Sequence, residues 1–179
     1  GWTAGGMPVM TAGPQLTLWR APTDNDVRVE PEWRAKGLDN LKHRLDGLTC
    51  EKLDEGTVRL TVVTRVAPPI FRQSFTCTYT YTVFGSGDLV LQVHGVPHGE
   101  WCDTLPRIGL AMTLPRELAD VTWYGRGPGE SYIDSQQAQR VGVFQSHVDA
   151  MLTPYVVPQE CGLRTDVRWV TLGNVRGAG

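Results

Sequence analysis

The feature that most constrains the fold is a strict alternation between Thr76 and Phe84. Threonines occupy every second position, and the positions between them hold larger apolar or aromatic residues. This period of two predicts a β-strand with one buried face, because successive side chains of a strand point to opposite sides. The alternation resumes at Leu89, after the turn signal Gly85-Ser86-Gly87. The two segments therefore predict an antiparallel hairpin.

Other segments show the same pattern over shorter stretches. Apolar and polar residues alternate from Thr57 to Val62, and the phase slips at Val62-Val63, which predicts a β-bulge in this strand. Pro68-Pro69 ends the strand. Later strands, separated by loops rich in Pro and Gly, are expected from Ile108 to Thr113, from Val121 to Tyr124, from Ala138 to Phe144 and from Val167 to Leu172.

The sequence also predicts one short helix. Leu38, Leu41, Leu45 and Leu48 are spaced by three, four and three residues, which would place them on one stripe of a helix. Many short strands with a single helix favour an all-β fold, an antiparallel β-sandwich, over an alternating α/β sheet. The chain of 179 residues is long enough for one domain with its own core, so we interpret residues 1–179 as one domain.

Charge and hydropathy limit the partners of the chain. Seventeen Lys and Arg against nineteen Asp and Glu give a net charge of −2, which provides no field for nucleic acid or anionic lipid. No apolar run approaches the roughly 20 residues needed to cross a bilayer, and the amino terminus lacks the pattern of an export signal. We therefore expect a soluble, cytoplasmic chain without nucleic-acid or membrane partners.

Metal and cofactor sites are not expected. Four cysteines are far apart, with no C-x-x-C pair; they could form two disulfides in three ways, but idle or buried thiols are preferred. A cluster of possible ligands gathers at His94, His98, Glu100, Cys102 and Asp103. The spacing of the two histidines needs a helix, which the intervening Gly and Pro disfavour, so a solvated loop is the preferred interpretation.

Four loop-like stretches concentrate polar and aromatic residues. They read WRAPTDND from Trp19, LPRIG from Leu105, YGRGPGESYID from Tyr124 and TPYVVPQECGLR from Thr153. In this order, they strongly resemble the small-chain or fifth-domain module of the bacterial β-galactosidases of glycoside hydrolase family 2. The resemblance runs from about Gly1 to about Leu172.

The sequence departs from the family pattern at four positions. The family usually has Asn where Ser131 and Cys161 stand, Pro at Ile133 and Arg at Ser135. These replacements weaken the transfer of a polar role to the four positions. They do not affect the assignment to the family.

The resemblance implies a fold and a parent activity. The implied fold is a supersandwich like that of galactose mutarotase, and the family's module continues beyond Gly179, so we expect truncation at the C-terminus. The implied activity is hydrolysis of terminal β-D-galactosides such as lactose, by two glutamates on a separate (β/α) barrel. No barrel pattern is present in this sequence. We therefore expect no catalytic residue and no cofactor within this chain.

The implied role is that of an accessory domain. It would buttress the catalytic barrel and shape the rim of the active site, and the isolated chain would be inactive. The implied partners are the barrel domain and the β-galactoside substrate. If the last strands are missing, an open sheet edge and part of a core face would favour a homo-oligomer.

Several acidic and aromatic residues of the loops are candidates for contact with sugar. A retaining glycosidase needs two carboxyl groups about 5 Å apart. Asp24 and Asp26 flank an Asn in a loop, and acids in such a position more often bond to backbone amides than act in catalysis. Glu130, Tyr132 and Asp134 would share one side of an extended segment, and bracing by Arg126 or Arg107 is preferred over a sugar site. The candidate carbohydrate-binding residues are Asp24, Asn25, Asp26, Trp101, Arg107, Glu130, Tyr132, Glu160 and Arg164.

Two further motifs have simpler interpretations. Gly125, Gly127 and Gly129 resemble part of a nucleotide loop, but the motif requires Gly where Glu130 stands, so the glycines are expected to adopt positive φ in a tight turn. Most of the large aromatic residues are expected to fill the core, with Trp101 or Tyr132 as the best candidates to face a ligand.

Two alternative functions remain at the level of sequence. A stand-alone carbohydrate-binding module would bind galactose or lactose by itself through a sheet face. A sugar isomerase similar to mutarotase would need a His and a carboxylate that converge on the sugar ring. None of the four histidines lies inside the four motif loops, so the isomerase ranks last.

Overall fold

The computed structural model describes residues 1–174, which form two compact units. The first comprises Gly1–Gln15, Pro22–Val27 and the chain from Ala111 onward, and we call it the loop unit because it holds two of the motif loops in full. The second comprises Leu16–Ala21 and Arg28–Leu110, and we call it the sheet unit. Each unit is described by itself.

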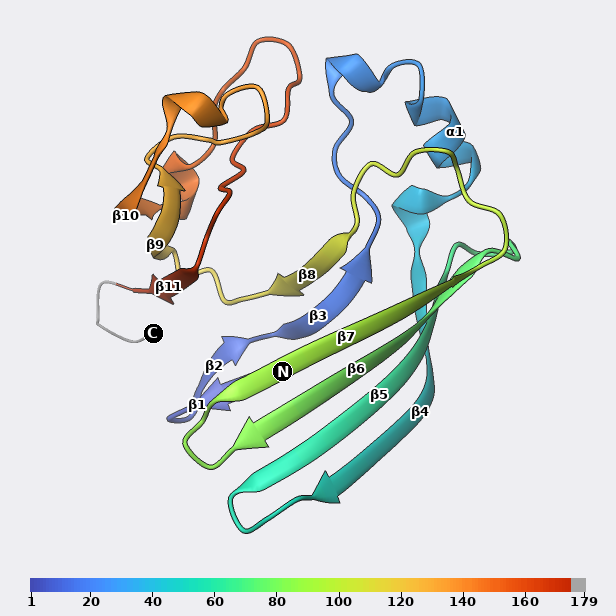
Figure 1. The fold of residues 1–179 in the computed structure, drawn as a ribbon, viewed down its shortest axis with the longest axis vertical. Helices are drawn as coiled ribbons and strands as arrows, with labels where there is room; N and C mark the ends of the chain where they lie inside the picture. The colour runs from blue at the N-terminus through green and yellow to red at the C-terminus, as the bar shows by residue number, and fades with distance from the viewer. Residues whose placement is uncertain (175–179) are drawn as a thin grey trace. The chain divides into compact units, whose positions relative to one another are not determined.

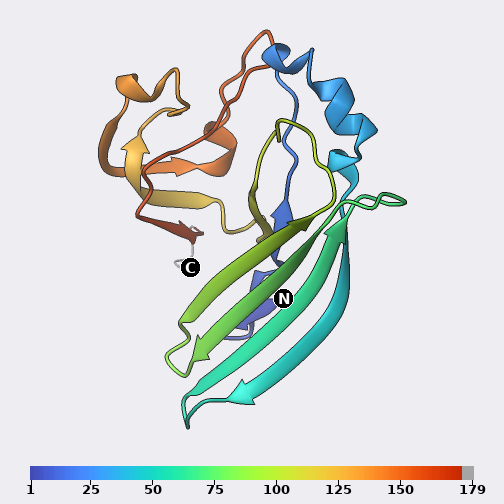
Figure 2. The same cartoon turned by 45° about the vertical axis from the view of Figure 1, so that its right-hand side comes forward.

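The sheet unit is built on four long antiparallel strands. They are β4 (Lys42–Lys52), β5 (Thr57–Ala67), β6 (Ser74–Phe84) and β7 (Leu89–His98), hydrogen-bonded in chain order. Figures 1 and 2 show them as long, curved ribbons side by side. The predicted hairpin is confirmed, since β6 and β7 pair across the turn with Val83 opposite Leu89. Pro68 directly follows β5, as expected.

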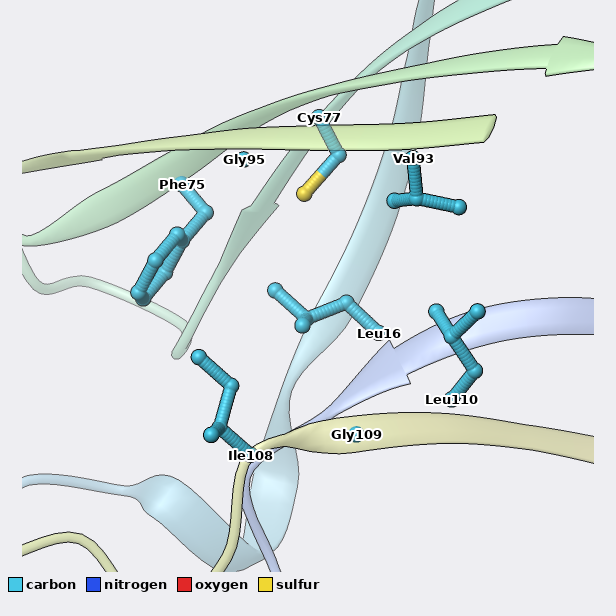
Figure 3. A pocket seen from close by; sticks show the side chains of 8 residues that line it. All are labelled: Leu16, Phe75, Cys77, Val93, Gly95, Ile108, Gly109 and Leu110. Atoms are coloured by element: carbon cyan, nitrogen blue, oxygen red, sulfur yellow. The ribbon is translucent and has the colours of Figure 1, made fainter. Parts of the chain in front are cut away.

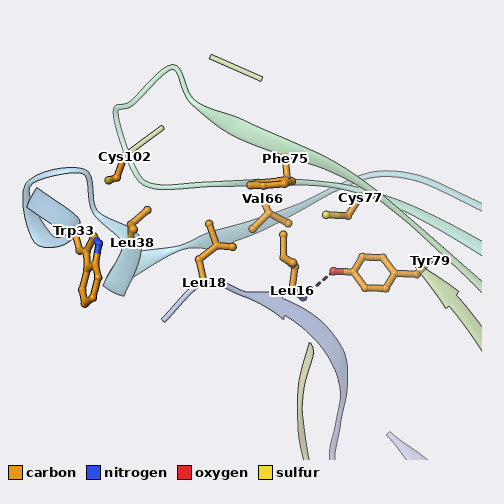
Figure 4. Packing of buried hydrophobic residues seen from close by; sticks show 9 residues of the cluster. All are labelled: Leu16, Leu18, Trp33, Leu38, Val66, Phe75, Cys77, Tyr79 and Cys102. Atoms are coloured by element: carbon orange, nitrogen blue, oxygen red, sulfur yellow. Dashed lines mark hydrogen bonds between the residues drawn. The ribbon is translucent and has the colours of Figure 1, made fainter. Parts of the chain in front are cut away.

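The alternation in β6 determines where the core lies. Phe75, Cys77 and Tyr79 are buried on one face, which we call the inner face of the sheet, and the threonines occupy the other face. Figure 4 shows these side chains packed against residues outside the sheet. The buried residues that cover them come from β3 (Ala12–Thr17), the segment after it, α1 (Glu30–Ala35) and the 3₁₀ helix η2 (Leu38–Asn40): Leu16, Leu18, Trp33 and Leu38.

Two hydrogen bonds hold this cover, one to the sheet and one to the loop after β7. The hydroxyl of Tyr79 accepts a bond of 2.9 Å from the backbone N–H of Leu16, at a buried site (Figure 4). The indole of Trp33 donates to the carbonyl oxygen of Thr104 at 3.0 Å. Buried polar groups need such partners, so both bonds help to fix the position of apolar groups that would otherwise be held by packing alone.

The predicted leucine helix is wrong. Leu45 and Leu48 lie in strand β4, Leu38 lies in η2, and the only α-helix of the described residues is α1, which the leucine pattern did not indicate. The spacing misled because Leu45 and Leu48 are three residues apart and still face the same side of a strand. An irregularity between Leu45 and Gly47 inserts one extra residue, which restores the phase.

The predicted bulge lies in the neighbouring strand. β5 pairs with β6 in continuous register through Val62 and Val63, and the irregularity is in β4, opposite Val63. An extra residue is easier to accommodate in β4 because this strand is paired on one side only within the described sheet. The sequence therefore indicated the correct position along the strands, beside Val63, but the wrong strand.

The loop unit contains a smaller antiparallel sheet. Strand β9 (Asp120–Gly127) lies between β10 (Arg140–His147) and β11 (Trp169–Gly173), and it buries Val121 and Trp123. The short strands β1 (Trp2–Ala4) and β2 (Met7–Met10) form a hairpin. Strand β8 (Gly109–Thr113) pairs with β3, and the boundary between the two units falls within both of these strands. The later strands are thus confirmed with shifted ends, while β1, β2 and β3 were not predicted. The all-β class is confirmed.

The thiols of the chain remain free. Cys77 and Cys102 are buried, Cys161 is partly buried and Cys50 is exposed, and none of the four forms a disulfide. Burial raises the pKa of Cys77 and of Cys102, because removal from water disfavours the charged thiolate. The buried pair therefore consists of unreactive core residues.

The inner face of the large sheet is covered over only part of its length. Toward the β4–β5 turn and the β4 edge, Leu45 and Leu48 are 59% and 58% exposed, and Val58 is 37% exposed. All three lie on the face that carries Tyr79, as the strand register shows. An apolar sheet face is stable when another layer covers it, so this half-covered region is a candidate contact surface. We call it the open face.

We expect Tyr79→Phe to destabilise the sheet unit. The substitution keeps the ring but removes the hydroxyl that accepts from the Leu16 N–H group, which would leave a buried donor unsatisfied. The expected loss is about 1–3 kcal/mol in the free energy of unfolding, measured by urea denaturation. The control is Tyr81→Phe, a half-buried neighbour on the same face, which should cost clearly less. Equal losses for the two variants would contradict the role of the bond.

Candidate functional site

The carboxylate of Glu130 is the centre of the contacts between the loops of the loop unit. Thr153 donates its hydroxyl to Oε2 of Glu130 at 3.1 Å, and the backbone N–H of Gly162 donates to the same oxygen at 3.2 Å. The hydroxyl of Tyr155 donates to Oε1. One acidic side chain after β9 thus holds both ends of the TPYVVPQECGLR stretch. We call these four residues the Glu130 cluster.

Arg164 braces the same region through backbone carbonyls. Its Nη1 and Nη2 atoms donate to the carbonyl oxygens of Gly162 and Pro128, each at 3.1 Å. The guanidinium lies over the indole of Trp123, 5.3 Å from the ring centroid. Burial lowers the pKa of Arg164, and the nearby charge of Glu130 opposes that effect. A planar donor group with several N–H groups suits this bracing, because one side chain can reach two segments.

The buried hydroxyl of Ser131 joins the two motif loops at a second point. Its Oγ accepts from the backbone N–H of Thr165 at 2.8 Å, and the hydroxyl of Thr165 donates to the carbonyl oxygen of Ser131 at 3.1 Å. The backbone N–H of Ser131 donates to the carbonyl oxygen of Leu163 at 2.9 Å. The resemblance weakened the expectation of a polar role at this position, and the Ser131 side chain nevertheless has a polar structural role. No local pattern in the sequence indicated that role.

Arg126 has a different partner from the one predicted. It forms an ion pair with Asp166, with Nε and Oδ2 2.5 Å apart, and it does not brace Glu130. Its Nη1 atom also donates to the carbonyl oxygens of Gln136 and Gln139, at 3.3 and 3.4 Å. Asp166 is forty positions away in the chain, so its proximity depends on the pairing of β9 with β11. Arg107 is exposed and lies in the sheet unit.

The DND motif forms a short, capped turn. The three residues make the 3₁₀ helix η1 (Asp24–Asp26). Oδ2 of Asp26 accepts from the backbone N–H of Thr23 at 2.7 Å and from its hydroxyl at 3.0 Å, which confirms for Asp26 the preference for backbone amides. The backbone N–H of Asp24 donates to the carbonyl oxygen of Pro158 at 2.9 Å. The side chains of Asp24 and Asn25 are exposed.

The remaining candidate residues are in varied surroundings. Trp101 lies in the sheet unit and is half-buried against Phe75, with ring centroids 4.9 Å apart. Its Nε1 atom has no hydrogen-bond partner among the described residues. Tyr132 is exposed and Glu160 is partly buried, both in the loop unit. The structure therefore brings Glu130 and the backbone of Asp24 into contact with the TPYVVPQECGLR stretch, and Arg164 at the end of this stretch reaches Pro128.

The glycines of the YGRGPG motif have a steric role. Gly125, Gly127 and Gly129 all lack positive φ, so the expected left-handed turn is wrong. A Cβ atom at Gly125 would lie 2.9 Å from the Cα of Val167, and one at Gly127 would lie 2.6 Å from the ring of Phe144. These glycines are needed because neighbouring chain segments and rings pack directly on the backbone of β9.

The suspected metal ligands are partly in a strand. His94 and His98 lie in β7, so the preferred interpretation of the whole stretch as a loop is wrong for them. The ring of His98 is 3.0 Å from the hydroxyl of Thr76 on the neighbouring strand. Among residues 1–174, no group of three or more His, Cys, Asp or Glu is arranged to hold a metal ion.

A shallow apolar pocket of about 240 Å³ lies in the sheet unit (Figure 3). Figure 3 shows Phe75, Cys77 and Val93 on the sheet side, with Leu16 and Ile108 opposite them. Every labelled side chain is apolar apart from the Cys77 thiol. A sugar site needs several polar groups that fix the hydroxyls, so this pocket does not have the chemistry of such a site.

Comparison with known proteins identifies the family. The model of the family described as "Beta galactosidase small chain" matches residues 1–178. The chain belongs to this family. It is 30% identical over 178 residues to a β-galactosidase of Priestia megaterium, which covers 96% of this chain and 16% of the relative. The chain is thus the small-chain domain of such enzymes, as the four motif loops indicated.

Other relatives carry the same name. A β-galactosidase of an Arthrobacter species is 34% identical over 193 residues, covering 95% of this chain and 18% of the relative. A β-galactosidase of Kluyveromyces lactis is 34% identical over 170 residues, covering 93% of this chain and 16% of the relative. The chain therefore spans about one sixth of the length of these relatives. The relatives support neither a stand-alone binding module nor a sugar isomerase.

The described part of the small-chain domain contains no helix that is both long and apolar enough to cross a membrane. The expected cytoplasmic location stays a prediction.

We expect Glu130→Gln to loosen the loops of the small-chain domain. The substitution removes the charge and replaces one acceptor oxygen by a donor, so the bonds from Thr153, Tyr155 and Gly162 cannot all persist. The expected cost is about 1–3 kcal/mol in the free energy of unfolding, with faster proteolysis of the 153–163 segment. The matched control is Asp134→Asn, an exposed acid of the same motif. Equal proteolysis of the two variants would contradict the role of Glu130.

Proposed function

We propose that this small-chain domain is a non-catalytic accessory part of a β-galactosidase that hydrolyses terminal β-D-galactosides such as lactose. The observation that carries the proposal is the match to the β-galactosidase small chain over residues 1–178. The catalytic carboxylates then belong to a separate barrel domain of the same polypeptide or complex, and the parent enzyme is a retaining glycosidase. The domain buttresses the barrel and shapes the rim of the active site.

The hydrogen bonds of the acidic residues in the motif loops support a structural role for these residues. A retaining glycosidase needs a nucleophilic carboxylate and an acid/base carboxyl group on opposite sides of the scissile bond. Glu130 directs both of its oxygens toward Thr153, Tyr155 and Gly162, and Asp26 directs one oxygen toward Thr23. Carboxylates held by several donors in this way are suited to fixing loops.

The loops could shape an active-site rim because they are held rigidly. The bond from Thr153 to Glu130 joins positions 23 apart in the chain, and the bond from Thr165 to Ser131 joins positions 34 apart. Asn25 and Tyr132 remain exposed on or beside these stretches. Binding residues often lie on loops positioned by a rigid scaffold, so these exposed groups are the candidates to reach a sugar at the rim.

The activity test compares the parent enzyme with the isolated domain. We expect the intact enzyme to hydrolyse lactose and a chromogenic β-galactoside, and residues 1–179 alone to give no turnover above the blank. Turnover by the purified domain would contradict the proposed non-catalytic role. Glu130→Gln in the intact enzyme should lower thermal stability and change kcat/KM by much less than the roughly 10⁴-fold or larger loss that removal of a catalytic carboxylate causes.

The open face is the proposed contact surface for the rest of the enzyme. Leu45, Leu48 and Val58 leave apolar surface exposed on a sheet whose other face carries the threonines. In the isolated domain this surface has no cover from another domain, so we expect residues 1–179 to self-associate as concentration rises. The measurement is molar mass by light scattering after size exclusion.

Two lysine variants test whether the open face causes the self-association, one on this face and one at a loop position of the other unit. Leu48→Lys should shift the isolated domain toward the monomer, because a charge on the open face opposes its burial. Val156→Lys, at a fully exposed loop position, should leave the association unchanged. A wild-type domain that stays monomeric at high concentration would overturn this part of the proposal.

A further inference from the structure

The small sheet of the loop unit carries an exposed pair of aromatic rings. Tyr124 of β9 and Trp169 of β11 are directly paired across the two strands, with ring centroids 6.3 Å apart and planes inclined by 41°. The Tyr124 residue is 36% exposed and Trp169 is 44% exposed. They lie on the face of β9 opposite to the buried Val121 and Trp123, because side chains alternate along a strand. We call this surface the aromatic platform.

Backbone and side-chain contacts hold the platform in place. The guanidinium of Arg168 lies over the ring of Tyr124, 5.3 Å from its centroid. Its Nη1 atom donates to the carbonyl oxygen of Asp166 at 2.6 Å, and its backbone N–H donates to the carbonyl oxygen of Tyr124 at 2.8 Å. One side of the Tyr124 ring is therefore occupied by a fixed cation, and the Trp169 indole is the more accessible ring of the pair.

The neighbours of the two rings are a mixture of apolar and polar groups. Val143 of β10 lies opposite Tyr124, and it is 60% exposed. The next row on the same face holds the hydroxyls of Thr122 and Thr171 and the amide of Gln145. Within residues 1–174, none of these three polar side chains forms a hydrogen bond to another residue. Flat rings thus lie beside donors and acceptors that are available to a ligand.

We propose that the aromatic platform binds the galactosyl unit of an oligosaccharide. The axial 4-hydroxyl of galactose leaves C–H groups together on one face of the sugar ring, and such a face stacks on an indole. The hydroxyl groups around the ring edge need donors and acceptors, which Thr122, Thr171 and Gln145 supply. The platform has one apolar row bordered by polar groups, whereas a stable protein interface usually needs about 800 Å² on each partner.

The platform is separate from the candidate residues of the motif loops. Trp169 follows the last motif loop in the sequence, and its role does not depend on Glu130, Tyr132 or Arg164. The choice of galactose rests on the proposed function of the parent enzyme. The platform is an accessory sugar-binding surface, distinct from the catalytic site. It would keep substrate close to the enzyme.

The test is a titration of the 179-residue chain with lactose and with β-1,4-galactobiose. The signal is the indole N–H resonance of Trp169 in two-dimensional NMR, assigned by its absence from the Trp169→Phe variant. We expect a saturable shift with a dissociation constant in the millimolar range. Trp169→Ala should weaken binding by about tenfold or more, because the stacking ring is lost. Trp169→Phe should weaken it less, since a flat ring remains.

Matched variants distinguish sugar binding on the platform from sugar binding elsewhere in the domain. Val156→Ala changes a fully exposed apolar residue of the same unit and should leave binding unchanged. Circular dichroism of each variant confirms that the fold persists. Binding that is lost in Tyr132→Ala and retained in Trp169→Ala would overturn the platform and favour the motif loops. Absence of any shift at saturating sugar would also overturn it, while lactose hydrolysis by the intact enzyme tests the proposed function independently.

Discussion

The inner face of β6 must be buried, and the sheet unit is arranged around this requirement. Phe75, Cys77 and Tyr79 are apolar or aromatic and point to one side, so the chain must supply a layer that covers them. Leu16 and Leu18 supply the centre of that layer, and the bond from the Leu16 N–H group to the Tyr79 hydroxyl fixes its position. Where this layer ends, the open face begins. The same requirement therefore explains both the core and the surface that is proposed to meet another domain.

The loop unit is organised by polar contacts to a greater degree. Glu130, Arg164 and Ser131 connect loops that would have few apolar contacts of their own. Hydrogen bonds to a charged group contribute about 1.5–3 kcal/mol each, which is enough to order a loop but not to build a core. An acidic residue of a small-chain domain need not be catalytic when both of its oxygens accept from neighbouring loops, as those of Glu130 do. The motifs that identify the family are thus also the residues that hold its loops.

The errors in the sequence interpretation have a common cause. The leucine spacing at positions 45 and 48 fits a helix, and it also fits a strand with one extra residue, which only the pairing with β5 reveals. The glycines at positions 125 and 127 are compatible with positive φ, but they are required because Val167 and Phe144 approach them closely. In both cases the deciding neighbour is distant in the sequence, and local patterns contain no information about it.

The residue pattern alone was sufficient for the strictly alternating strands, the β6–β7 hairpin, the all-β class and the family. Period and turn residues act over a few positions, and motif order needs no coordinates, so these features can be read from the chain. It was not sufficient to show that Arg126 pairs with Asp166, that Glu130 meets Tyr155, or that Trp169 lies beside Tyr124. The first of these contacts joins residues 40 positions apart and the second joins residues 25 positions apart. Such contacts depend on how strands and loops come together in space, which no local pattern encodes.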